Sequence, residues 1–265
     1  AFQALDAARN PKSATSTANF DENSTINVGG DFIWDSNESS GNLNGNLNLK
    51  GNFIDKRGNK RWDGTVTMSG SKQQTIQMEA GSYIANLATP NANIKVGKYF
   101  STSLKNSLTL KSDESVIYTK NGLNLGEYSL TVPGSLVAFG GVELGRGGNL
   151  IVKGDFRQES GILTIPGSAT LDVDGSLSFQ SLDAVGNVRA STSSMDVLEN
   201  STINVGGNFI WNSNDSDYPW WLQGAWKGKL NLKGNYIDRL GNRQWDGTVN
   251  LNGNSQQTIL MEKDS

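Results

Sequence analysis

The chain is 265 residues long, with 35% hydrophobic residues, 31 glycines and a formal net charge of −3. It contains neither cysteine nor histidine, which excludes disulfides, cysteine metal sites and Ser-His or Cys-His nucleophile pairs. No cluster of lysine and arginine marks a nucleic-acid surface, and no apolar run approaches the roughly 20 residues of a transmembrane helix. We therefore expect no nucleic-acid partner, no membrane span and no cofactor.

A long repeat begins at the first residues. FQALDAARN at 2–10 reappears as FQSLDAVGN at 179–187, and ENSTINVGGDFIW ending at Trp34 reappears as ENSTINVGGNFIW ending at Trp211, an offset of 177. Past an insertion, LNLKGNFIDKRGNKRWDGTV from Leu47 is answered from Leu230, an offset of 183. We interpret 1–177 as one complete unit and 178–265 as a partial second copy, continuous with the first in one solenoid. The start AFQALDAARN is not a signal peptide, so we expect a piece of a longer protein.

A shorter period lies inside each copy. An aliphatic residue, any residue and then glycine recur at 28–30, 49–51, 68–70, 132–134, 152–154, 173–175, 205–207, 232–234 and 251–253. Neighbouring spacings are mostly 19 to 21 residues, and two longer ones of 32 and 27 each contain a polar insertion. Segments such as TINV, LNL and TLDV between the glycines alternate in polarity, which predicts short strands separated by turns.

Two all-β arrangements fit this period. In a parallel β-helix (β-solenoid), each turn of about 20 residues forms one rung, and aliphatic side chains stack on the same position of the next rung, about 4.8 Å away. A β-sandwich would need hairpin turns between longer strands, and clean Asn-Gly hairpin signals are few. The pattern favours the solenoid, with about 11 rungs and loop insertions.

Aromatic and amide residues recur at fixed places in the rung. Phe32, Phe53, Phe156 and Phe209 each follow a corner glycine by two residues, which predicts an aromatic core position stacked from rung to rung. Asparagine-rich stretches such as NLNGNLNLKGN at 42–52 are typical of amide ladders and of turns with left-handed backbone angles. Neither feature requires a ligand.

The run GGNLIVKGDFRQESGILTI at 147–165, with its G-x-L-x-V-x-G-[DN]-F rhythm, resembles repeat segments of large bacterial surface and secreted β-solenoid proteins, the adhesin-like class. The resemblance is at the level of the fold and covers most of the chain. It implies secretion, attachment to the cell surface, and adhesion or scaffolding. It identifies no substrate and transfers no functional residue.

The insertion in the second copy is the most distinctive local feature. The sequence NSNDSDYPWWLQGAWKG places Tyr218, Trp220, Trp221 and Trp226 where the first copy has only DSNESSGNLNGN. Clustered rings on a polar loop suit the apolar C–H faces of sugar rings or a protein partner. The alternative is that the loop packs its rings against the solenoid. Trp34, Trp62, Trp211 and Trp245 occur in both copies, which favours structural roles for them.

Metal binding and catalysis have weaker candidates. Asn212, Asn214, Asp215 and Asp217 carry oxygen ligands suited to calcium but lack the glycine and glutamate of a calcium loop, so a solvated loop is favoured and no metal is expected. Carboxylates could serve a polysaccharide lyase or hydrolase on a β-helix. The candidates recur in IDKRGNKRWDG and IDRLGNRQWDG, where Trp-Asp-Gly reads as a corner: Asp55, Asp63, Asp238 and Asp246.

Together these patterns predict a non-catalytic structural or adhesive segment of a large extracellular, bacterial tandem-repeat protein. The aromatic loop is its expected contact with a polysaccharide, a surface glycan or a host surface. The alternative is a polysaccharide-degrading β-helix enzyme. Terminal rungs with unpaired edges also predict end-to-end self-association.

Overall fold

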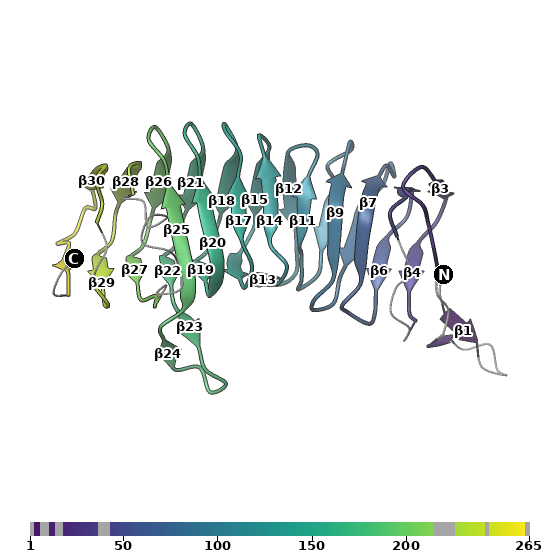
Figure 1. Ribbon diagram of the computed structural model, residues 1–265, viewed down its shortest axis with the longest axis horizontal. Coiled ribbons are helices and arrows are strands. Elements are labelled where there is room, and N and C mark those ends of the chain that lie inside the picture. The colour runs from purple at the N-terminus through teal and green to yellow at the C-terminus, as the bar shows by residue number, and fades with distance from the viewer. Residues whose placement is uncertain are drawn as a thin grey trace. The chain divides into compact units, whose positions relative to one another are not determined.

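The structure is a computed structural model that describes residues 3–5, 11–13, 18–36, 43–214, 226–241 and 244–262 (Figure 1). Within these ranges all regular structure is β, and no helix is long and apolar enough to cross a membrane. Parallel sheets stack as a β-solenoid of about 10 turns with rungs of about 21 residues. This confirms the predicted all-β parallel β-helix.

The chain divides into two compact units, Ala1–Asn121 and Gly122–Ser265, called unit 1 and unit 2 below. The repeat boundary after residue 177 therefore falls inside unit 2. The proposed continuity of the two sequence copies in one solenoid stays a prediction.

Unit 1 contains two main parallel sheets. Their strand orders are β3-β5-β7-β9-β11 and β4-β6-β8-β10-β12. The strands of unit 1 are β1 Gln3–Leu5, β2 Pro11–Ser13, β3 Thr25–Val28, β4 Phe32–Trp34, β5 Asn46–Leu49, β6 Phe53–Asp55, β7 Arg61–Met68, β8 Gln74–Gln77, β9 Tyr83–Ala88, β10 Ile94–Val96, β11 Thr102–Leu104, β12 Leu108–Lys111 and β13 Val116–Thr119.

Unit 2 contains three parallel sheets. Their strand orders are β15-β18-β21-β26-β28-β30, β16-β19-β22-β27-β29-β31 and β14-β17-β20-β25. The strands of unit 2 are β14 Leu123–Gly126, β15 Ser129–Val132, β16 Ser135–Ala138, β17 Val142–Leu144, β18 Asn149–Val152, β19 Phe156–Gln158, β20 Ser160–Ile165, β21 Thr170–Val173, β22 Leu177–Phe179, β23 Ser181–Leu182, β24 Val188–Arg189, β25 Thr192–Val197, β26 Thr202–Val205, β27 Phe209–Trp211, β28 Lys229–Leu232, β29 Tyr236–Asp238, β30 Thr248–Leu251 and β31 Ile259–Leu260.

The register in unit 2 aligns like residues in columns. Leu150 pairs with Leu130 on one side and Leu171 on the other, and Val152 pairs with Val132 and Val173 in the same way. These side chains alternate with half-buried ones along each strand and are fully buried. The aliphatic-x-glycine repeat therefore records the inward residue at the end of a strand and the corner that follows it.

The recurrent aromatic position is confirmed as part of the core. In unit 1 the rings of Phe32 and Phe53 stack with centroids 5.4 Å apart, and in unit 2 Phe209 and Tyr236 stack at 5.2 Å. Phe156 pairs with Leu177 in the same type of strand and is fully buried. An aromatic or aliphatic ring face thus covers the same place in successive rungs.

Two antiparallel hairpins interrupt the parallel pattern at equivalent places in the two copies. In unit 2, β23 pairs with β24 through Ser181 opposite Arg189 and Leu182 opposite Val188. In unit 1, the residues 177 positions earlier pair identically, with Ala4 opposite Lys12 and Leu5 opposite Pro11. Figure 1 shows the β23–β24 hairpin extending away from the rungs of unit 2. The polar insertion behind the 32-residue spacing is therefore a hairpin that does not join the parallel sheets.

Candidate functional site

The predicted aromatic loop is described only at its end. Tyr218, Trp220 and Trp221 lie outside the described residues. Trp226 is 3% exposed, and its indole N–H donates to the backbone oxygen of Met195 at 2.8 Å. Its ring centroid lies 4.8 Å from that of Trp211. Trp226 is therefore a packing residue of unit 2, with no open ring face for a sugar.

The tryptophans shared by both copies also pack inward. Trp34, Trp62 and Trp211 are buried, and Trp245 is half-buried. The indole N–H of Trp62 donates to the backbone oxygen of Gly45 at 2.8 Å, and that of Trp245 donates to the equivalent oxygen of the second copy at 3.0 Å. A bond repeated at the same sequence offset identifies a structural device of the rung.

The recurrent carboxylates hold turns. Asp55 Oδ1 accepts bonds from the backbone N–H groups of Arg57 and Gly58 at 2.9 and 3.2 Å, and Asp238 Oδ1 accepts from the two equivalent groups at 3.0 and 2.9 Å. Both aspartates are buried. Gly58 has φ of +74°, a backbone conformation that a side chain would strain. Asp63 pairs with Arg61, and Asp246 accepts from Gln244 at the surface.

A buried glutamine closes the next corner in the same way. Gln74 Oε1 accepts from the N–H of Gly70 at 2.7 Å, while its amide nitrogen donates to the backbone oxygens of Leu49 and Gly51. Gln257, 183 residues later, makes the three equivalent bonds. Without this side chain the turn would leave several backbone groups unpaired.

The calcium candidates do not form a described site. Asn212 is buried, Asn214 is exposed, and Asp215 and Asp217 lie outside the described residues. Elsewhere in the part of the chain that the structure describes, no three acidic side chains are grouped to hold a metal ion.

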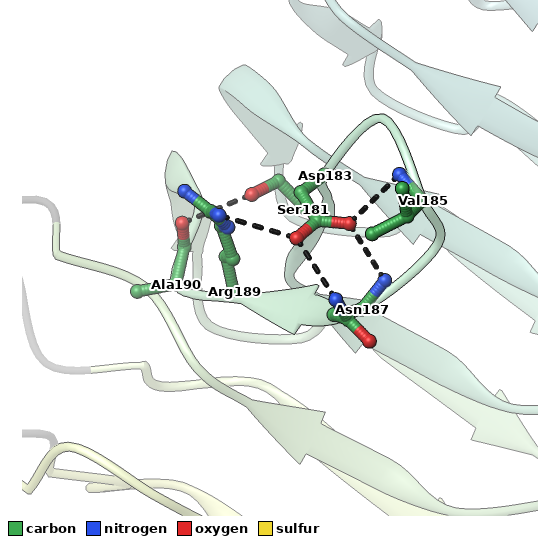
Figure 2. Close-up of polar contacts among 6 residues, drawn as sticks. All are labelled: Ser181, Asp183, Val185, Asn187, Arg189 and Ala190. Atoms are coloured by element: carbon green, nitrogen blue, oxygen red, sulfur yellow. Dashed lines mark hydrogen bonds and ion pairs between the residues drawn. The ribbon is translucent and has the colours of Figure 1, made fainter.

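The β23–β24 hairpin carries the densest polar network (Figure 2). Asp183 Oδ1 accepts from the backbone N–H groups of Val185 and Asn187 at 3.0 and 2.8 Å. Its Oδ2 accepts from the side chains of Asn187 and Arg189, both at 3.1 Å. These bonds, first among them the one from the Asn187 backbone, lower the pKa of the Asp183 carboxyl. The network holds a short loop whose tip residue, Val185, is 82% exposed.

Sequence reasoning did not find this hairpin. The available signal was the recurrence of Asp, then Asn four residues later, then a cation two residues further on: Asp183, Asn187 and Arg189 repeat Asp6, Asn10 and Lys12. The aspartate is the residue that bonds the loop backbone, so its recurrence follows from the hairpin geometry.

A polar ladder and a hollow lie on the outward face of the first sheet of unit 2. Asn204 donates to Asp172, Asn231 donates to Asn204 at 2.7 Å, and Asn250 donates to Asn231 at 2.8 Å. A hollow of about 630 Å³ lies over β18, β21, β26 and β28 and includes the first three of these side chains in its lining. Sequence analysis anticipated amide ladders at corners, whereas this ladder runs across strands.

These features place the chain among β-solenoid proteins. The chain matches no protein-family model, and no curated protein or solved structure is significantly similar to it. The class is thus defined by the fold and by the devices that its two sequence copies share.

Proposed function

We propose that this chain is a non-catalytic structural and adhesive segment of a large extracellular tandem-repeat protein. One observation carries the proposal: the polar side chains shared by both copies make the same backbone bonds in each copy. Asp55 and Asp238 cap equivalent turns, Gln74 and Gln257 close equivalent corners, and Trp62 bonds a corner oxygen as its counterpart does. Residues repeated for catalysis would keep their functional groups directed at a cleft.

The proposed location is the bacterial cell surface or the extracellular space. The G-x-L-x-V-x-G-[DN]-F rhythm that resembles adhesin-like solenoids supports it. A rigid stack of rungs suits a spacer, because each rung needs only its neighbours for burial.

Adhesion is assigned to the insertion that only the second copy has, through Tyr218, Trp220 and Trp221. The test is binding to a glycan array by the chain and by a variant with Trp220→Ala and Trp221→Ala. Trp226 stays unchanged because it packs in the core. We expect the parent chain to bind and the folded variant to lose binding. Cleavage of a polysaccharide by the purified chain would contradict the non-catalytic assignment.

A second copy of the chain is the proposed partner of the last rung of unit 2. Leu251 and Ile259 of this rung are 37% and 57% exposed, whereas the equivalent Met68 and Ile76 of unit 1 are fully buried. In unit 1 the strands that follow, β9 and β10, pair with β7 and β8 and cover those residues. A rung of this same sequence therefore has the shape and edge to cover the exposed one.

A further inference from the structure

The hollow on unit 2 owes its form to a glycine in a row of long side chains. The residues that follow the ends of β18, β21, β26, β28 and β30 are Lys153, Asp174, Gly206, Lys233 and Asn252. All five line the hollow. A Cβ at Gly206 would lie 2.1 Å from the backbone oxygen of Asp174, so no other residue fits there without a backbone shift. The row is therefore interrupted at its centre.

The floor of the hollow presents regularly spaced amide groups. Asn204 and Asn231 are half-buried on adjacent strands, about 4.8 Å apart. Each amide has two N–H donors and an oxygen with two lone pairs, and each ladder bond uses one donor and one acceptor site. A donor and an acceptor site per rung remain for a ligand. Donor and acceptor pairs of this kind match the neighbouring hydroxyls of a sugar.

The rim is balanced in charge and the far end is apolar. Lys153 and Asp174 form an exposed ion pair at 3.2 Å, Lys233 stands across the glycine gap, and Asp172 lies on the floor. Two cations against two carboxylates give no net attraction for a charged polymer. Ile151 adds an apolar patch beside the floor, suited to the C–H face of a sugar ring.

The geometry points to a binding site for an internal stretch of a linear, neutral polysaccharide. The amides of Asn204 and Asn231 bond its hydroxyls, and the side chains of Asp174 and Lys233 hold its edges. The hollow lies along successive rungs on an outer sheet face, so a chain longer than the hollow can pass through it. This site deepens the proposed adhesive function and rests on it, but it is separate from the tryptophan insertion.

The test is an NMR titration of the full chain with oligosaccharides derived from cellulose, xylan and mannan, and with an oligogalacturonate as the charged probe. We expect at least one neutral probe to shift the side-chain amide signals of Asn204 and Asn231. The rim variant Asp174→Ala with Lys233→Ala should weaken that binding roughly tenfold or more. It should fold normally, because an exposed ion pair adds little stability.

A matched pair of floor variants separates binding from ladder stability. Asn231→Leu removes the floor amide inside the hollow, and Asn48→Leu removes the equivalent amide of unit 1, which donates to Asn27 at 2.8 Å. Binding should be lost in the first variant and kept in the second.

Three results would overturn the proposal: no amide shift with any neutral probe, stronger binding of the oligogalacturonate, or equal binding by the rim variant. Loss of glycan-array binding on changing Trp220 and Trp221 tests the insertion alone, so failure of the hollow and failure of the proposed adhesion are distinguishable.

Discussion

Asp55 and Asp238 act at the scale of single residues, by pairing backbone groups that a tight turn would otherwise bury unpaired. Each accepts two backbone N–H bonds while almost wholly shielded from water. A buried donor that loses its acceptor costs more than the lost bond contributed, because it was desolvated on folding. The aspartate is therefore needed by the turn wherever the rung recurs.

Asp55→Ala should lower the free energy of unfolding by about 1–3 kcal/mol, because two turn N–H groups lose their acceptor. Asp63→Ala is the control, since its exposed pairing with Arg61 contributes about 0–1 kcal/mol. Urea denaturation followed by circular dichroism measures both. Equal losses in the two variants would contradict the capping role.

Tyr236 makes a pH prediction at the same scale. Burial, with a smaller effect of the Asp238 charge, raises the pKa of its phenol to about 12 from the ordinary 10.0. The folded state therefore keeps the proton at pH values where the unfolded state has lost it. The stabilisation is complete below pH 10 and is lost as the pH rises toward 12. Ultraviolet titration of the folded chain should show this late ionisation, and Tyr236→Phe should remove this part of the alkaline loss of stability. Ionisation of Tyr236 at its ordinary pKa would disprove it.

The Trp226 ring shows how packing assigns a residue to the core despite its place in an insertion. It contacts Trp211, and its N–H bonds Met195. Trp226→Ala should therefore reduce stability by about 3–5 kcal/mol, as expected for a buried large aromatic. Thermal unfolding of this variant beside the Trp220→Ala and Trp221→Ala variant measures the difference. An unchanged melting temperature for Trp226→Ala would contradict the core role.

Among the elements, strands and hairpin contribute differently to the coil. The parallel strands of unit 2 bury an aliphatic residue at alternate positions and pair in both directions. The hairpin between β22 and β25 pairs only with itself, through Ser181 opposite Arg189 and its neighbours. Its order comes from the Asp183 network rather than from the rungs.

Replacing residues 182–189 with a two-residue turn should therefore leave the coil folded. The parallel pairing of β20 with β25, from Ser160 opposite Thr192 to Ile165 opposite Val197, does not include the deleted residues. Shortening a surface loop changes closure entropy by less than about 1 kcal/mol. Circular dichroism and thermal unfolding should match the parent. Collapse of the β signal would show that the hairpin is needed by the rungs.

On the scale of the whole molecule, the last rung of unit 2 determines how chains meet. Its exposed aliphatic side chains and unpaired strand edge are typical of a surface that adds strands. Sedimentation velocity over a rising concentration should show reversible association of the chain. Leu251→Lys with Ile259→Lys should abolish it, because two buried, unpaired charges would oppose the contact. A monodisperse monomer at every concentration would contradict the self-association.

The sequence by itself determined the all-β class, the rung length and the inward columns. These features repeat in every rung, so their period is visible in the sequence whatever lies next to each strand. The matching offsets of 177 and 183 also predicted that the shared tryptophans and aspartates have structural roles. The expectation of about 11 rungs came close to the observed 10 or so.

Only the tertiary structure decided that Trp226 packs in the core, that the long spacing is a hairpin, and that a hollow opens beside Gly206. Each depends on which residues meet across rungs, such as Asn204 with Asn231, 27 positions apart in the chain. An insertion shifts that distance without leaving a local signal. Contacts between rungs follow the register of the coil, and the register exists only once the chain has folded.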